Sequence, residues 1–308
     1  MQDATEIIIF YKYTPIANPK GLMVWMRAMC TELDIRGRIL IANEGINGTA
    51  EGTVPAIRQF EERMHAQNGT KGTFADFSNV WFKHSPGTGD AFPKLKIKVR
   101  NEIVTLGLGA EGDIDPNKIT GTHATPEEVK AWIQSGEDFT IVDMRNDYEF
   151  KVGRFKDSIN PQMENFRDLA SAAPELEPLK KKKVLTVCTY GVRCEKASGY
   201  LKSQGFEDVY QLDGGIGTYM KAFPGEDFLG SLYVFDGRIT ERFTDNYEVV
   251  GVCHACGKQS EHYGNCAIHD CHKKLIICES CEASGVAIFC SDKCAHVQAS
   301  FSRAAGVQ

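Results

Sequence analysis

One cysteine-containing loop near the middle of the chain constrains the fold more than any other segment. The run V-L-T-V at 184–187 is followed by C-T-Y-G-V-R-C, which places Cys188 and Arg193 at the two ends of a six-residue loop. A helix is predicted to begin near Glu195. A buried strand, a short loop and a helix in this order are typical of open α/β sheets, in which ligands bind at the carboxyl ends of the strands.

The loop has the chemistry of a reactive-thiol site. Its backbone N–H groups and the helix N-terminus point at the loop centre, and Arg193 adds positive potential. Such a field favours the thiolate of Cys188 over the thiol. The alternative is a small buried cysteine at a strand end. A second thiol, Cys194, follows directly, and we expect a resolving thiol, a second reactive centre or a packed side chain at the helix start.

Motifs on both sides of the loop give residues 122–224 a specific resemblance to a rhodanese-like domain. The resemblance implies a parallel sheet flanked by helices. Four residues separate Cys188 from Arg193, as in rhodanese sulfurtransferases, whereas the related phosphatases have five, so a phosphatase is the less favoured enzyme. The motifs are D-M-R at 143–145, Y-E at 148–149, G-R-F at 153–155 and L-D-G-G at 212–215.

The segment before this domain has the pattern of a smaller α+β domain. Its β-α-β-β-α-β order predicts a ferredoxin-like sandwich with two helices on one face of the sheet. A glycine- and aspartate-rich stretch at 107–116 lacks periodicity and is the predicted linker, which gives domains at 1–115, 119–224 and 225–308. The predicted strands are 7–13, 37–42, 79–83 and 94–100, the predicted helices are near 22–33 and 54–65, and a hairpin turn is predicted at 43–48.

The last of these strands carries a basic stripe. Lys94, Lys96, Lys98 and Arg100 alternate with apolar residues and therefore occupy one face of the strand. The stripe suits a nucleic-acid phosphate backbone, although any half-exposed antiparallel strand shows the same alternation. The formal net charge of −6 argues against a uniformly basic nucleic-acid binder but not against a local basic surface. Tyr190, inside the cysteine loop, is predicted either to stack on a base or to be a surface aromatic residue.

The third region is rich in cysteine. Two C-x-x-C pairs and two further cysteine pairs predict two tetrahedral four-cysteine zinc sites with a structural role. The sequence does not show which cysteines share a metal; one pairing joins the C-x-x-C motifs at 253–256 and 278–281 and leaves the other four cysteines for the second site. Disulfides and an iron–sulfur cluster are the alternatives, and the nearby histidines are expected to lie outside the ligand sets. The eight cysteines are Cys253, Cys256, Cys266, Cys271, Cys278, Cys281, Cys290 and Cys294.

Other classes of site are not supported by the sequence. There is no signal-like N-terminus and no apolar run of membrane-spanning length, so we expect a cytoplasmic protein without a membrane partner. The sequence has neither a strand-linked G-x-G-x-x-G motif nor a P-loop, so no nucleotide cofactor is expected. A two-histidine, one-carboxylate iron site is also missing.

As a whole, the chain resembles the bacterial tRNA uridine hydroxylase family, most specifically at I-A-N-E-G-I-N-G (41–48), at 188–197 and at F-D-G-R (235–238). The resemblance implies oxygen-dependent 5-hydroxylation of the wobble uridine, with the tRNA anticodon loop as partner and molecular oxygen as co-substrate. We expect catalysis by Cys188, Cys194 and Arg193, and substrate binding by Tyr190 and the basic stripe. A sulfurtransferase that carries a persulfide and a non-enzymatic binding module are the alternatives.

Overall fold

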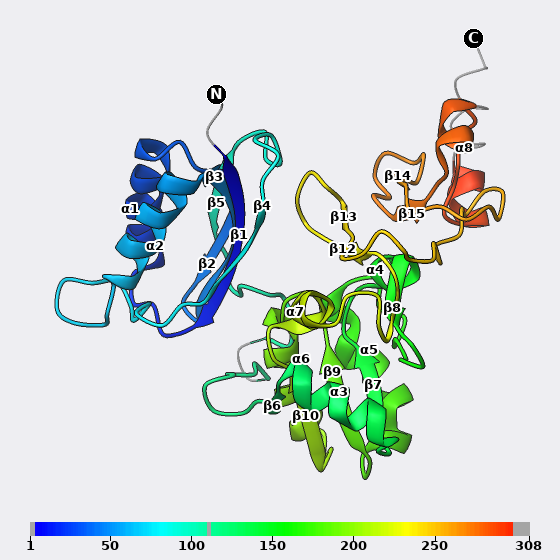
Figure 1. The fold of residues 1–308 in the computed structure, drawn as a ribbon, viewed down its shortest axis with the longest axis horizontal. Helices are drawn as coiled ribbons and strands as arrows, with labels where there is room; N and C mark the ends of the chain where they lie inside the picture. The colour runs from blue at the N-terminus through cyan, green and yellow to red at the C-terminus, as the bar shows by residue number, and fades with distance from the viewer. Residues whose placement is uncertain (1–3, 110–111, 298–308) are drawn as a thin grey trace.

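The computed structural model describes residues 4–109 and 112–297. Its first part is an α+β sandwich with the sheet order β4-β1-β3-β2-β5 (Figure 1). β5 runs parallel to β2, and the other neighbouring strands are antiparallel. The elements are β1 (Thr5–Tyr13), α1 (Pro19–Glu32), β2 (Arg36–Ala42), β3 (Gly45–Thr53), α2 (Val54–His65), β4 (Phe82–Pro86) and β5 (Leu95–Val99).

Alternation along β1 explains why this sandwich has one covered and one open sheet face. Ile8 and Phe10 point into the core under α1 and α2, whereas Ile9 and Tyr11 point to the opposite face. That opposite face is turned towards the rest of the molecule (Figure 1). The predicted ferredoxin-like arrangement is therefore confirmed, and its open sheet face is available to build a site.

Most predicted boundaries in this part differ from the structure by one to three residues at most, but two differences have a clear local reason. The strand predicted at 79–83 begins only at Phe82, because the Asp76 carboxylate accepts hydrogen bonds from Ser78 and holds the preceding residues in a turn. The hairpin turn predicted at 43–48 is shorter, since β3 already begins at Gly45.

The central domain is built on a parallel sheet with the strand order β6-β10-β9-β7. Helices pack on it, so the predicted parallel α/β domain is confirmed. The elements are β6 (Thr122–Ala124), α3 (Pro126–Ser135), β7 (Thr140–Asp143), α4 (Asp147–Val152), β8 (Gly153–Phe155), η1 (Phe166–Asp168), α5 (Leu169–Ala172), η2 (Ala173–Leu179), β9 (Lys183–Val187), α6 (Val192–Ser203), β10 (Asp208–Leu212) and α7 (Gly215–Ala222).

The cysteine loop joins β9 to α6 and is shorter than predicted. Helix α6 begins at Val192 rather than near Glu195, so Arg193 and Cys194 lie in its first turn. Gly191 precedes the helix with φ 96°, a left-handed conformation that glycine adopts without strain. This sharp turn lets the helix N-terminus face Cys188.

The third part begins inside the central domain. β11 pairs with β8, and Leu232 and Val234 belong to the same apolar core as Leu185. Ile114, from the predicted linker, is also buried in the central domain. Because contacts of the central domain extend across these limits, the structure does not define sharp boundaries, and the domain limits at 115, 119 and 224 stay predictions. The elements are β11 (Phe228–Gly230), β12 (Leu232–Tyr233), β13 (Thr240–Glu241), β14 (Tyr263–Asn265), β15 (Lys274–Ile276) and α8 (Glu279–Ala283).

Within the described ranges, no helix combines the length and the apolar character that crossing a bilayer requires.

Candidate active site and metal centres

Cys188 lies at the carboxyl end of β9 and is fully buried. The backbone N–H of Gly191 donates a hydrogen bond to its Sγ atom at 3.2 Å, and the backbone N–H groups of Arg193 and Cys194 also point at this sulfur. The first turn of α6 therefore encloses Sγ with donors. This is the arrangement that the sequence predicted for a stabilised thiolate.

The two thiols of the loop have opposite ionisation tendencies. Burial opposes ionisation of Cys188, but the hydrogen bond from the Cys194 thiol, the Arg193 charge and the backbone donors outweigh burial and lower its pKa to about 6. Burial and the hydrogen bond to Cys188 raise the pKa of Cys194 well above its ordinary value. Cys188 is therefore the thiolate of the pair, and Cys194 is its hydrogen-bond donor.

Arg193 is held by the carboxylate of Glu149, a residue of the Y-E motif for which the sequence predicted no role. Glu149, from α4, is fully buried and accepts two hydrogen bonds from the Arg193 guanidinium, at 2.6 and 2.8 Å. Thr189 Oγ1 accepts another at 3.1 Å. Burial lowers the pKa of Arg193, but the pairing with Glu149 outweighs burial and raises this pKa above its ordinary value. The Y-E motif at 148–149 is the sequence feature that could have indicated this ion pair.

Cys188 lines a cavity of about 330 Å³ between the first two domains, which we call the thiol cavity. The central domain contributes Thr189 and Arg193, and the open sheet face of the first domain contributes Arg38 and Asn47. The part of the cavity lining that the first domain contributes was not predicted. The residue pattern of a strand does not tell which domain will cover its open face. The described lining residues also include Ile9, Tyr11, Leu40, Thr105, Asn146, Asn165, Arg167, Tyr190 and Phe235.

Tyr190 is not a surface aromatic residue, so that alternative is wrong. Its side chain is buried in the core of the central domain, with 8% of its surface exposed. Its hydroxyl donates a hydrogen bond to Glu241 at 2.8 Å, and the Lys83 ammonium lies 3.9 Å from the ring centroid. Stacking of Tyr190 on a base stays a prediction, and it requires a free ring face.

The basic stripe lies on the strand that the sequence predicted. Lys94, Lys96, Lys98 and Arg100 are exposed at β5 or beside it, and Ile97 between them is buried. In the register of β2 and β5, Lys96 is beside Arg38, which lines the thiol cavity. Paired residues of neighbouring strands share a face. The lysines therefore continue the surface that leads to Cys188.

A buried lysine joins the first two domains next to the cysteine loop. Lys196, in α6, is fully buried and forms ion pairs with Glu44 at 2.7 Å, Glu102 at 2.8 Å and Asp113 at 3.1 Å. Glu44 belongs to the I-A-N-E-G-I-N-G segment between β2 and β3. Through Glu44, this network connects the β2–β3 turn of the first domain to the helix that carries Cys194.

The eight cysteines of the third part form two clusters, and their pairing, which the sequence leaves open, is the one named above as an example. Cys253, Cys256, Cys278 and Cys281 make the first cluster, and Cys266, Cys271, Cys290 and Cys294 make the second. In the second cluster, neighbouring Sγ atoms are 3.5 to 3.7 Å apart. None of these eight cysteines forms a disulfide, so the disulfide alternative is wrong.

The donor sets fit tetrahedral metal ions. Four sulfurs at 2.3 Å from a metal lie about 3.8 Å from one another, close to the observed separations. Backbone N–H groups also reach two of the sulfurs, Cys278 to Cys253 and Cys290 to Cys266, at 3.3 and 3.5 Å. None of the histidines in the described part of the chain belongs to either cluster. Both sites thus offer four thiolates and no open position for chemistry.

Family models match three segments of the chain. A model described as UPF0176 acylphosphatase like domain matches residues 5–103, one described as rhodanese-like domain matches 125–222, and one described as rhodanase C-terminal matches 229–295. Whole-length relatives are also similar. A tRNA uridine(34) hydroxylase from Corynebacterium jeikeium is 39% identical over 96% of each chain.

Two further relatives carry the same name. The tRNA uridine(34) hydroxylase of Cytophaga hutchinsonii is 42% identical over 94% of this chain and 89% of its own length. That of Bacillus thuringiensis is 42% identical over 94% of this chain and 88% of its own length. The similarity therefore includes both domains that enclose the thiol cavity and the cysteine-rich part.

Proposed function

The chain belongs to the tRNA uridine(34) hydroxylase family, and on that premise we propose that it hydroxylates carbon 5 of the wobble uridine of tRNA with Cys188 as the reactive thiol. Molecular oxygen is the co-substrate in this proposal. The observation that carries it is the position of Cys188, because a sulfur held as a thiolate lines a cavity between two domains that are both similar to the relatives.

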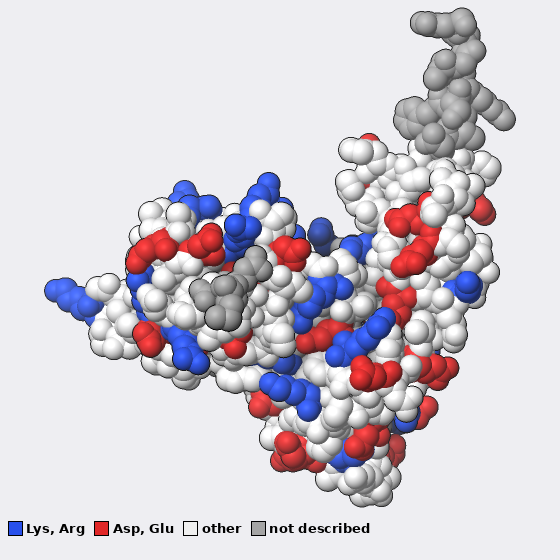
Figure 2. All heavy atoms as spheres, turned by 45° about the horizontal axis from the view of Figure 1, so that its top comes forward, with Lys and Arg blue, Asp and Glu red and all other residues white. Residues whose placement is uncertain are grey.

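The burial of Cys188 sets the way in which the substrate binds. A base that is stacked in RNA does not reach a fully buried sulfur, so the target uridine leaves the stack and enters the thiol cavity. Anticodon loops present unstacked bases, and proteins hold such loops by phosphate contacts and stacking. Figure 2 shows Lys and Arg side chains, with acidic ones between them, on both sides of the groove beside the first domain.

The chemistry follows from thiolate addition. Cys188 Sγ attacks carbon 6 of the uracil, which makes carbon 5 electron-rich and able to take one oxygen atom derived from O2, while a two-electron reductant and two protons convert the other oxygen atom to water. Arg193 and the N–H groups of the loop stabilise the enolate charge that develops on the ring oxygen. Cys194 keeps the attacking sulfur ionised through its hydrogen bond, or acts as a resolving thiol if Cys188 is oxidised.

The remaining parts of the proposal concern metal, RNA contacts and location. We assign zinc to both cysteine clusters with a purely structural role, since four thiolates leave no open coordination position. Lys94, Lys96, Lys98 and Arg100 hold the RNA backbone at the entrance of the thiol cavity. The protein acts in the cytoplasm, where thiols stay reduced.

The test is mass spectrometry of nucleosides from unmodified tRNA after incubation with the purified protein, in air and under nitrogen. Formation of 5-hydroxyuridine only in air, with loss of activity in Cys188→Ser, supports the proposal. Full activity of Cys188→Ser together with an inactive Cys194→Ser would reverse the roles of the two thiols. Sulfur transfer from thiosulfate without any hydroxylation would make the protein a sulfurtransferase.

A further inference from the structure

Tyr11 separates the thiol cavity from a second cleft. This outer cleft has a volume of about 530 Å³ and is lined by residues of both domains, among them Tyr11, Trp81, His123 and Glu195. Tyr11 lines both spaces. A side chain at Gly191 would place its Cβ only 2.8 Å from the Tyr11 hydroxyl oxygen, so this hydroxyl lies against the cysteine loop.

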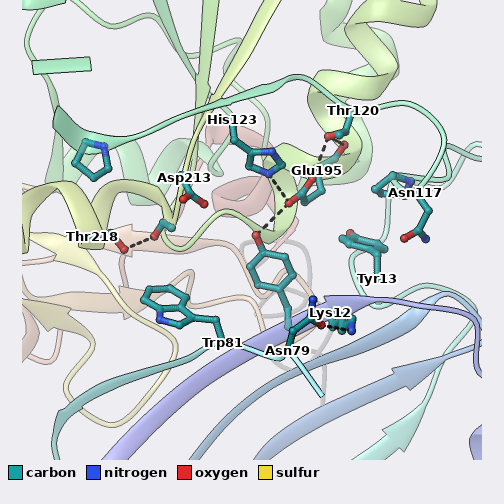
Figure 3. A pocket seen from close by; sticks show the side chains of 14 residues that line it. Lys12, Tyr13, Asn79, Trp81, Asn117, Thr120, His123, Glu195, Asp213 and Thr218 are labelled. Carbon is teal, nitrogen blue, oxygen red and sulfur yellow. Dashed lines mark hydrogen bonds and ion pairs between the residues drawn. The ribbon is translucent and has the colours of Figure 1, made fainter. Parts of the chain in front are cut away.

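A continuous chain of hydrogen bonds leads from this hydroxyl to solvent. Tyr11 donates to Glu195 Oε1 at 3.3 Å, and His123 Nε2 lies 3.0 Å from the same oxygen. The His123 side chain is 46% exposed and opens into the outer cleft, where it points at Glu195 with Trp81 across from both (Figure 3). Thr120 and Gln211 hold the other carboxylate oxygen, Oε2, each at 3.0 Å.

The proposed hydroxylation requires a proton acceptor in the thiol cavity. Once a hydroxyl group is on carbon 5, the adduct still carries the original hydrogen at carbon 5 and the sulfur at carbon 6. Release of the product needs a base that removes this hydrogen as a proton. The C5–H electron pair then forms the C5=C6 double bond, the C6–S bond breaks, and its electrons return to Sγ as the thiolate.

We propose that Tyr11, Glu195 and His123 are the proton relay for this step, an inference that rests on the proposed function. The Tyr11 hydroxyl oxygen takes the proton from carbon 5 while its own proton moves to Glu195 Oε1. In the tautomer with hydrogen on Nδ1, His123 accepts the proton from Glu195 at Nε2 and releases the Nδ1 proton to solvent in the outer cleft. Tyr11 is the catalytic residue in this relay, and Glu195 and His123 act through it.

The other ionisable groups of the thiol cavity fit this step less well. Its described arginines stay protonated at all relevant pH values, and Cys188 is the leaving group. Tyr190 also bonds a carboxylate, but that carboxylate, Glu241, is paired at 3.2 Å with Arg238, whose guanidinium cannot accept a proton and pass it on.

The resting protonation states also suit the relay. Burial and the Glu195 charge raise the pKa of Tyr11 well above its ordinary value, so the phenol keeps its proton. Burial raises the pKa of Glu195, but its interactions with His123, Gln211 and Thr120 together outweigh burial and leave the pKa below its usual range. Glu195 is thus an ionised acceptor beside a protonated phenol.

The experiment compares tRNA carrying hydrogen or deuterium at carbon 5 of the target uridine, in single-turnover hydroxylation followed by nucleoside mass spectrometry. For Tyr11→Phe we expect a rate lower by about 10²-fold and a larger isotope effect than in the wild type, because proton removal becomes rate-limiting. Glu195→Gln should behave in the same way. Tyr13→Phe is the matched control, since the Tyr13 hydroxyl donates to the Val192 carbonyl of the same helix at 3.2 Å without entering the relay.

Each outcome decides a different point. Equal rate losses in Tyr11→Phe and Tyr13→Phe, with an unchanged isotope effect, would overturn the relay and leave hydroxylation intact as the function. A larger isotope effect in Tyr190→Phe but not in Tyr11→Phe would move the base to Tyr190 and overturn this assignment. A wild type that forms no 5-hydroxyuridine would refute the proposed function itself.

Discussion

Replacing Cys194 by alanine tests the origin of the Cys188 thiolate. The substitution removes the thiol that donates to Sγ of Cys188, while the backbone donors and Arg193 stay in place. A hydrogen bond to a charged acceptor contributes about 1.5–3 kcal/mol, and one pKa unit corresponds to about 1.4 kcal/mol. The pKa of Cys188 should therefore rise by about one to two units from its value of about 6.

The assay is the pH dependence of iodoacetamide alkylation, with the modified residue identified by peptide mapping. With a pKa of about 6, most of the wild-type Cys188 should be thiolate at pH 7, and half or less in Cys194→Ala, so alkylation at pH 7 should slow and its midpoint should move to higher pH. Cys30 is the internal control, because burial raises its pKa to about 12.

Cys194→Ser provides the matched variant, since its hydroxyl still donates to the sulfur and should keep the midpoint close to that of the wild type. An unchanged midpoint in Cys194→Ala would refute the assigned role of Cys194. A wild-type midpoint near the ordinary cysteine value would refute the thiolate itself.

Further predictions concern the domain junction, the metal sites and the basic stripe. Lys196→Met should lower the free energy of unfolding by about 3 kcal/mol in urea denaturation, because it leaves the partly buried Glu44 and Glu102 carboxylates without this partner; a loss no larger than that of the exposed control Lys202→Met would contradict this. Elemental analysis should find two zinc ions per chain, and Cys253→Ser should reduce this to one; one or no ion in the wild type would refute the assignment. Lys96→Gln combined with Lys98→Gln should make tRNA affinity less dependent on salt, by about 0.7 in the logarithmic slope per lysine; an unchanged slope would remove the stripe from the RNA interface.

Local sequence patterns were sufficient for the elements whose geometry depends on neighbouring residues. The strand, loop and helix around Cys188 follow from the apolar run before the cysteine and the helical stretch after it, and the C-x-x-C spacing indicates two four-cysteine sites, although it leaves their pairing open. The alternation of Lys96 and Lys98 with apolar residues also persists in β5. In each case the deciding contacts are within the element or between adjacent elements.

Features that depend on contacts between distant segments were not predicted. The N-terminal wall of the thiol cavity, with Arg38 and Asn47, exists only because the open sheet face packs against α6. The position of Tyr190 depends in the same way on Lys83 and on Glu241, which come from the first and third parts. No periodicity within one segment carries that information.

The enclosure of Cys188 has a consequence for the lifetime of the enzyme. A thiolate with a pKa of about 6 on an open surface would meet every peroxide and disulfide in its surroundings and would pass irreversibly to the sulfinic and sulfonic acids. Here the sheet of the first domain covers the sulfur, and large oxidants are kept out. The N-terminal domain is therefore a chemical shield as well as a wall of the cavity, and separating it from the central domain would shorten the working life of the thiol.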